Sequence, residues 1–219
     1  MSVAKRCKGF NSKCFLFTYL MIVGFLLVLW INRLPLMQEE LREIPADMQE
    51  YISSPARHLP DVSLNTKNKL ALTNGWFNDK WSFVYFSHGQ CLPACLPILT
   101  TLRELKSGLA NKDVQFLVIG IDSENETAEQ LDEFLIAQRM DATSATASTE
   151  MIDQLARYFI ALFLKTDFSD GSYQIEQEHH VFLVDPKGRV YATFMPPYLS
   201  SAKIKERFLK LRRFYAKTE

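Results

Sequence analysis

The chain has 219 residues, which is long enough for one ordinary domain with an ample hydrophobic core and for further segments outside it. Its 25 lysine and arginine residues balance 25 aspartate and glutamate residues, so the formal net charge is zero. A polyanion would find no electrostatic support on such a chain, and this excludes nucleic acid as a main partner.

The N-terminal residues predict a membrane anchor. Residues 1–13 contain four basic and no acidic residues, and residues 14–31 are a run of 18 uncharged, mostly apolar residues. This run is just long enough for a helix that spans a bilayer. The residues that follow lack the cleavage site of a signal peptide, which favours an uncleaved transmembrane helix. The basic flank predicts a cytoplasmic N-terminus, so the rest of the chain is expected on the periplasmic side of the inner (cytoplasmic) membrane of a bacterium.

A tether is expected between this anchor and a folded domain. Residues 32–57 are rich in glutamate and are interrupted by prolines, and only residues 37–52 favour a helix. The predicted organisation is therefore a cytoplasmic N-terminus (1–13), a single-pass anchor (14–31), a tether (32–57) and a folded domain (58–219).

The folded domain is predicted to have an α/β fold. Residues 83–86 and 114–121 are continuous apolar runs, typical of strands covered on both faces, and apolar residues recur at helical spacing from Ile98 to Leu109. The other expected elements are a hairpin at 61–72, helices at 127–138, 149–159 and 200–214, and strands at 180–184 and 190–194. This order predicts a thioredoxin-like layout, in which helices flank a central mixed sheet.

Two cysteines lie in the turn between the first buried strand and its helix. Cys91 and Cys95 are four positions apart, so on a helix both sulfurs would aim at one point, for a disulfide or for a metal ion. A helix N-terminus lowers the pKa of a thiol and favours the thiolate that both chemistries need. So close a pair cannot link distant parts of a fold, and it indicates redox or metal chemistry.

A metal held by this pair is predicted to be copper. Two thiolates alone favour a soft ion, above all Cu(I), and a nearby imidazole would make a site that also accepts Cu(II). The candidate imidazoles are His179 and His180, which come just before the strand at 180–184. Side chains alternate along a strand, so at most one of the two is expected to reach the sulfurs.

Three other polar residues near the turn are given structural interpretations. His88 lies beside the cysteines, but a lone histidine is more often a structural residue than a ligand. Asp122 and Glu126 precede the helix that begins at Thr127, and we expect them to cap and position that helix.

Several segments of the chain match the pattern of a known family. These segments are residues 84–86 with the C-x3-C pair that follows, residues 120–129, Tyr173, and residues 182–188. Together they resemble the Sco/SenC family of membrane-anchored, thioredoxin-like copper chaperones of cytochrome c oxidase assembly. The resemblance covers roughly residues 58–215. It implies that Cys91 and Cys95 bind copper, and that the protein delivers copper to, or reduces the cysteines of, an oxidase subunit.

The chain also departs from this family pattern. The family usually has proline directly after each cysteine, whereas leucine follows both cysteines here. An ungapped match places Gln177 where the family has its metal-binding histidine. His179 lies two residues further on, hence on the same strand face, and we predict it as the third copper ligand.

Two other functions remain open at this point. The first is a membrane-anchored periplasmic thiol-disulfide oxidoreductase that uses Cys91 and Cys95 catalytically. Against it, residues 173–184 contain no proline, although a thioredoxin has its substrate-contacting cis-proline there. The second is a redox sensor whose cysteine pair only forms a disulfide. We expect a metallochaperone rather than an enzyme.

Overall fold

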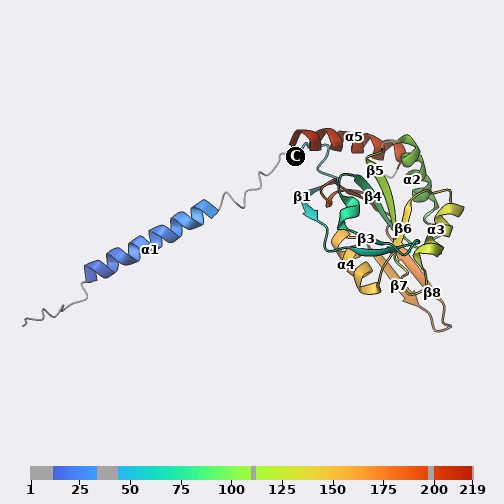
Figure 1. Cartoon of the computed structure of the whole chain (residues 1–219), viewed down its shortest axis with the longest axis horizontal. Coiled ribbons are helices and arrows are strands. Elements are labelled where there is room, and N and C mark those ends of the chain that lie inside the picture. Colours follow the sequence, from blue (N-terminus) through green and yellow to red (C-terminus); the bar gives the residue numbers. More distant parts are fainter. Residues whose placement is uncertain (1–11, 34–43, 110–111, 197–199, 219) are drawn as a thin grey trace, which may run out of the picture. The chain divides into compact units, whose positions relative to one another are not determined.

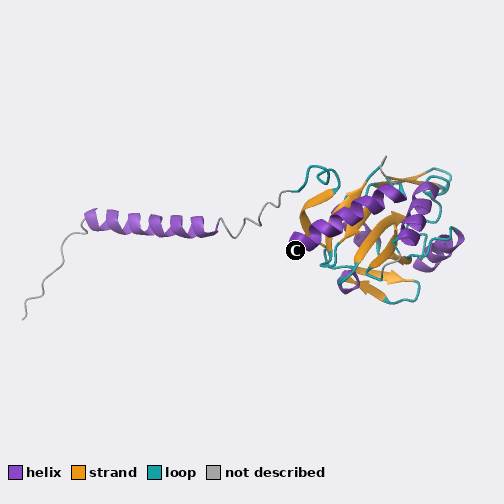
Figure 2. Ribbon diagram, turned by 90° about the horizontal axis from the view of Figure 1, so that it is seen from above, coloured by secondary structure: helices purple, strands orange, loops and turns teal. Residues whose placement is uncertain are grey.

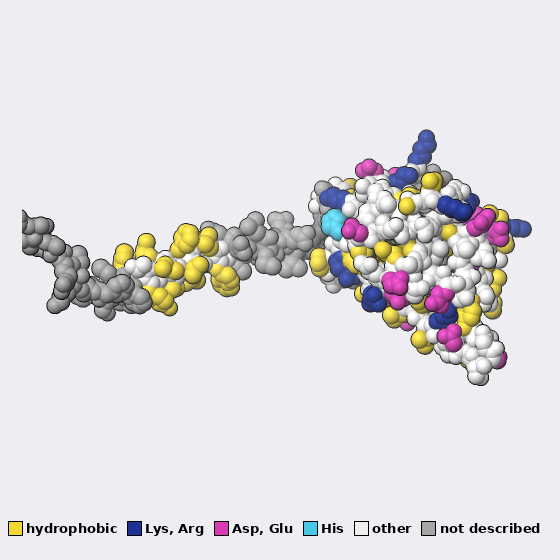
Figure 3. All heavy atoms as spheres, turned by 60° about the horizontal axis from the view of Figure 1, so that its bottom comes forward, with side chains coloured by type: hydrophobic (Ala, Val, Ile, Leu, Met, Phe, Trp, Pro, Cys, Tyr) yellow, Lys and Arg dark blue, Asp and Glu magenta, His cyan; other side chains and the backbone are white. Residues whose placement is uncertain are grey.

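The computed structural model describes residues 12–33, 44–109, 112–196 and 200–218. The chain consists of two units, Met1–Pro45 and Ala46–Glu219 (Figure 1). In the first unit, helix α1 (Ser12–Arg33) covers the predicted anchor, and its described side chains are mostly hydrophobic (Figure 3). Among the helices of the described residues, none is long and apolar enough to cross a membrane.

The predicted tether differs from the structure where the structure describes it. Residues 34–43 lie outside the described residues, and residues 46–51 form turns rather than the end of a helix. Strand β1 (Ile52–His58) then begins, so residues 46–57 belong to the folded unit. Two features account for this difference. Pro45 cannot continue a helix, and β1 gains hydrogen bonds by pairing with β10 (Arg189–Phe194).

The folded unit is built on one eight-stranded mixed sheet with strand order β1-β10-β9-β4-β5-β6-β2-β3. The central strands β4, β5 and β6 run parallel, and every other neighbouring pair in this sheet is antiparallel. The remaining strands are β2 (Ser63–Thr66), β3 (Ala71–Thr73), β4 (Trp81–Ser87), β5 (Val114–Gly120), β6 (Thr143–Thr146) and β9 (Val181–Val184). This arrangement confirms the α/β, thioredoxin-like prediction.

Helices cover both faces of the sheet, as expected. They are α2 (Leu96–Gly108), α3 (Ala128–Ala137), α4 (Thr149–Phe159) and α5 (Ser201–Thr218), with a short 3-10 helix at Asn74–Phe77. Figure 2 shows α5 lying across the strands. Phe208 of this helix packs edge-on against Trp81 and Phe83, with ring centroids 5.6 and 5.1 Å apart. On the opposite face, Phe159 of α4 packs against Phe86. All seven residues of β4 are therefore buried.

One hairpin was not predicted. Strands β7 (Phe163–Asp167) and β8 (Tyr173–Gln177) pair only with each other and form a separate two-stranded sheet (Figure 1). Their turn contains Gly171 at φ +84°, a conformation that glycine adopts without strain. Because half of the hairpin's side chains face solvent and most are polar, its sequence carries no apolar run.

Replacing Phe208 should test how strongly α5 is held on the sheet. Phe208→Ala removes a fully buried ring and is expected to lower the free energy of unfolding by about 3–5 kcal/mol. The matched control is Leu209→Ala on the same helix, which removes a side chain that is 37% exposed and should cost about 0.5 kcal/mol. Chemical denaturation measures both values, and equal losses would contradict the packing described here.

Candidate redox and metal site

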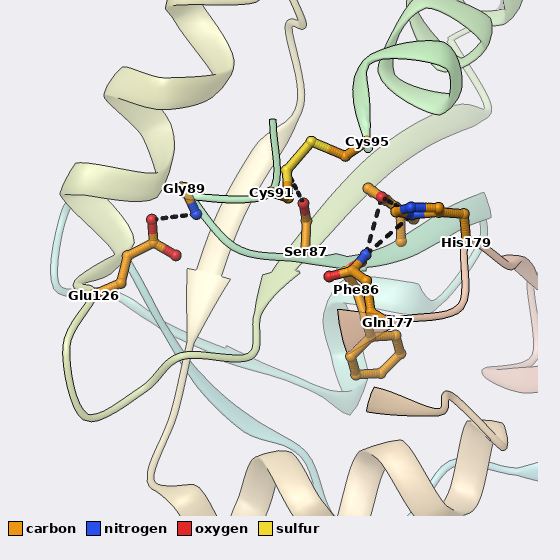
Figure 4. The surroundings of a disulfide bond; sticks show 9 residues. Phe86, Ser87, Gly89, Cys91, Cys95, Glu126, Gln177 and His179 are labelled. Carbon is orange, nitrogen blue, oxygen red and sulfur yellow. Dashed lines mark hydrogen bonds between the residues drawn. A yellow bond between two sulfur atoms is a disulfide. The ribbon is translucent and has the colours of Figure 1, made fainter. Parts of the chain in front are cut away.

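Cys91 and Cys95 lie between β4 and α2, at the carboxyl end of a strand whose residues are all buried. They form a disulfide, with their Cα atoms 5.5 Å apart (Figure 4). The prediction that the two sulfurs converge is therefore confirmed. Cys95 is the N-cap residue of α2, and Cys91 lies in the preceding turn. This is the position where the helix dipole favours a thiolate.

The two sulfurs differ in their access to solvent. Cys95 is completely buried, whereas Cys91 is 6% exposed and lines a cavity of about 470 Å³. The Ser87 hydroxyl lies 3.5 Å from the Cys91 sulfur. The cavity is lined by His88, Gln90, Cys91, Leu92, Pro93, Ala94, Tyr173, Gln174, Ile175, Glu176, Gln177 and His179. A reactant in this cavity therefore meets Cys91 first.

Gln177 and His179 face the same side of the chain, as their spacing predicted (Figure 4). The Gln177 amide donates hydrogen bonds to the Phe86 carbonyl at 3.0 Å and to the Tyr85 hydroxyl at 3.1 Å. The Tyr85 hydroxyl lies 2.8 Å from Nδ1 of His179. The direction of this last hydrogen bond is set by which ring nitrogen of His179 carries the proton.

Burial sets the charge state of this network. Burial raises the pKa of Tyr85, so its phenol stays protonated and can donate. Burial, with a smaller contribution from neighbouring His180, lowers the pKa of His179. The imidazole is therefore neutral at neutral pH, and among the described residues its Nε2 has no hydrogen-bonding partner.

His180 is directed elsewhere, as alternation predicted. Its Nε2 lies 3.2 Å from the Glu178 carboxylate, and its ring packs edge-on against Phe182. Only His179 of this histidine pair lines the cavity with Cys91. With the sulfurs joined in a disulfide, no three His, Cys, Asp or Glu side chains within the described residues are grouped closely enough to hold a metal ion. Copper binding by Cys91, Cys95 and His179 thus stays a prediction.

Comparison with known proteins identifies the family. Residues 52–212 match the family model described as SCO1/SenC. The chain belongs to the SCO1/SenC family. Homologues of this chain are copper-binding proteins, and some of their structures were solved with copper bound.

Three relatives illustrate the similarity to other Sco proteins. The Arabidopsis thaliana mitochondrial protein SCO1 homolog 1 is 24% identical over 112 residues, which are 49% of this chain and 33% of that protein. The crystal structure of Arabidopsis thaliana ScoI with copper bound has a TM-score of 0.61 and 20% identity, covering 70% of this chain and 97% of that one. BsSco, described as a member of the Sco family of cytochrome c oxidase assembly proteins and as having a disulfide switch, has a TM-score of 0.54 and 19% identity, covering 65% and 86%.

The similarity to these relatives shows the fold of this chain but not what the chain binds. Both of these solved structures are less than 25% identical to this chain over the aligned residues, so they establish the fold alone. The chain also spans only a third of the length of the Arabidopsis SCO1 homolog 1 that it matches. What each relative binds or assembles is therefore a property of that relative.

The acidic residues before α3 have a different role in this Sco protein from the predicted one. Thr127 and Gln130 cap α3 by themselves in a reciprocal capping box. Asp122 instead accepts a hydrogen bond from the Tyr173 hydroxyl at 2.6 Å. Glu126 accepts one from the backbone N–H of Gly89 at 2.8 Å, so it fixes the turn that leads to Cys91 (Figure 4).

Sequence reasoning missed this role of Glu126. The two residues are 37 positions apart, and nothing in either sequence segment signals their contact. Gly89 fits because a Cβ atom there would collide with the Glu126 carboxylate. Burial raises the pKa of Glu126 to about 7, and the other carboxylate oxygen has no hydrogen-bonding partner among the described residues.

The raised pKa of Glu126 should make stability depend on pH. Because the folded state holds this proton more tightly than the unfolded state, the stabilisation is complete below pH 4.5, the ordinary pKa, and is lost as the pH rises through about 7. Glu126→Gln cannot titrate, so the free energy of unfolding of the wild type minus that of the variant should fall across this range. Denaturation at a series of pH values measures this difference. A difference that stays constant with pH would show that Glu126 does not titrate in this way.

Proposed function

We propose that this SCO1/SenC protein binds copper as a cargo ion and delivers it to, or reduces the cysteines of, a cytochrome c oxidase copper centre. One observation carries the proposal: Cys91 and His179 line the same cavity, and Cys95 is within bonding distance of Cys91. Copper bound in the structure of Arabidopsis ScoI, and the description of the Sco family as oxidase assembly proteins, support it.

The donor set suits this ion. Reduction of the disulfide frees two thiolates, which prefer Cu(I), and α2 stabilises the negative charge of Cys95. His179 adds a neutral imidazole whose Nε2 is open, and this ligand extends the site to Cu(II). When Nε2 binds a metal, the ring proton resides on Nδ1 and can be donated to the oxygen of Tyr85.

Gln177 supports this site without serving as a strong ligand. Its amide nitrogen donates hydrogen bonds to the Tyr85 hydroxyl and the Phe86 carbonyl, which fixes the end of β8 two residues before His179. A carboxamide is a weak ligand for copper compared with an imidazole. We therefore assign the third ligand position to His179.

Copper titration of the reduced full chain tests the proposal. His179→Ala should weaken Cu(II) binding about 100-fold or more, because one of three ligands is lost, whereas Cu(I) binding by the two thiolates should persist. His180→Ala is the matched control and should leave both affinities unchanged, since His180 is paired with Glu178 outside the site. Absence of one-to-one copper binding by the reduced wild type would refute the proposed function.

A thiol-disulfide oxidoreductase is the second candidate function. The disulfide between Cys91 and Cys95 favours it, as does the access of Cys91 to the cavity. The same His179→Ala variant separates the two functions. If thiol exchange is the function, its rate should be almost unaffected by the substitution, and copper should bind no more tightly than to a generic dithiol.

The membrane location is part of the same proposal. The uncharged run at 14–31 and the basic residues before it support an inner-membrane anchor with the folded unit in the periplasm. Fractionation of cells should leave the full chain in the membrane after a carbonate wash. Protease added to spheroplasts should cleave the folded unit but not residues 1–13. Recovery of the full chain in the soluble fraction would contradict this location.

A further inference from the structure

Strand β8 has one unpaired edge. Backbone hydrogen bonds alternate along an antiparallel pair, and here the bond from the Glu178 N–H to the Leu162 carbonyl sets which residues face β7. Residues 174 and 176 therefore bond to β7, and the N–H and C=O groups of Tyr173, Ile175 and Gln177 point the other way. Among the described residues, no hydrogen bond reaches these outward groups.

This open edge borders the cavity that contains Cys91. All five residues of β8 line the cavity, whereas none of β7 does. One face of a strand would present only alternate residues, so the cavity runs along the edge of β8 that lies opposite β7. Leu92, Pro93 and Ala94, which follow Cys91 in the chain, line the same cavity.

The geometry points to an extended, cysteine-bearing segment of the recipient protein that pairs with β8 as an added strand and presents its thiol to Cys91. This inference rests on the proposed thiol or copper exchange with a recipient. Exposed strand edges invite pairing, and many proteins recognise peptides in this way. The N–H and C=O groups of three alternate residues of β8 point outward, as they do along a strand that can accept a neighbour. An extended peptide would supply the hydrogen-bond donors and acceptors that pair with these groups.

The charge of the residues that line the cavity indicates which residues should surround the cysteine of this segment. Among the described residues that line the cavity, Glu176 is the only Asp, Glu, Lys or Arg. The one carboxylate that lines the cavity therefore gives it a negative charge at neutral pH. A segment with basic rather than acidic residues around its cysteine suits it best.

The covalent step proceeds through Cys91. With the oxidised protein, the thiolate of the segment attacks the Cys91 sulfur, and a new disulfide forms between the segment and Cys91. The Cys91–Cys95 bond breaks, and its electron pair leaves on Cys95 at the N-terminus of α2, where the thiolate then accepts a proton from solvent. The reverse sequence, with the reduced protein, transfers electrons to an oxidised recipient through the same mixed disulfide.

Backbone-methylated peptides test the strand pairing on the wild-type full chain. The probe is the reduced peptide acetyl-Lys-Val-Thr-Cys-Thr-Val-Lys-amide, and acid quenching with mass spectrometry gives its rate of reaction with the oxidised protein. One isomer carries N-methyl groups on the two threonines, and the other carries them on the cysteine and the first valine. These isomers block opposite edges of the extended peptide.

The two isomers should react at different rates. Blocking the edge that faces β8 should slow the reaction about tenfold, and blocking the other edge should leave it unchanged. Equal rates for the two isomers would overturn the inference. Free cysteine is the reference thiol. If it fails to open the disulfide, the thiol chemistry of the proposed function fails as well, whereas normal reaction with free cysteine but equal peptide rates refutes the strand pairing alone.

Two variants of the protein test the same strand pairing by changing β8 instead of the peptide. Ile175→Pro removes an outward N–H that is not bonded to β7, and proline is tolerated at such an edge position. Ile175→Ala removes the same side-chain packing but keeps the N–H. The proline variant should react with the peptide about tenfold more slowly than the alanine variant, and both should react equally with free cysteine. Equal peptide rates for the two variants would overturn the inference.

Discussion

Burial of β4 on both faces is the constraint on which the rest of the site depends. Phe208 packs on one face and Phe159 on the other, so β4 cannot slide or rotate without exposing aromatic rings. Parallel pairing with β5 along its whole length fixes its register. The carboxyl end of β4 is thereby held in place, and with it Ser87 and the turn that carries Cys91. Because the turn follows directly on this rigid strand, the positions of the sulfurs are well defined.

Tyr85 transmits this rigidity to the other side of the cavity. The side chain of Tyr85 is buried, and burying a hydroxyl group costs free energy of folding unless the group is hydrogen-bonded. Gln177 and His179 supply those bonds, so the end of β8 and the residues before β9 are tied to β4. Glu126 does the same for the turn itself through Gly89. These three hydrogen bonds between distant segments hold the residues beside the disulfide in place.

The sequence allowed the core of the fold and the cysteine pair to be predicted, because both depend on local signals. Helix α4 forms at the predicted residues, with Ser148 as its cap, and the apolar runs became β4 and β5. Strands β1 and β8 were missed because their half-exposed polar residues have no apolar periodicity. The contact between Gly89 and Glu126 could not be predicted either, since it arises only when the sheet brings two turns together.

The two proposed chemistries of Cys91 and Cys95 exclude each other at any moment. A disulfide leaves no thiolate for copper, and copper bound to both thiolates leaves no free nucleophile. Reduction by two electrons is therefore a condition for loading the site, whichever protein supplies them. The two cysteines differ in a way that suits reduction of the disulfide before copper loading. Cys91 lines the cavity, where a reductant can reach it, whereas Cys95 is buried at a helix N-terminus that stabilises a leaving thiolate. A recipient that reacts first with Cys91 releases Cys95 as the leaving thiolate, so thiol transfer and copper transfer can both begin at Cys91.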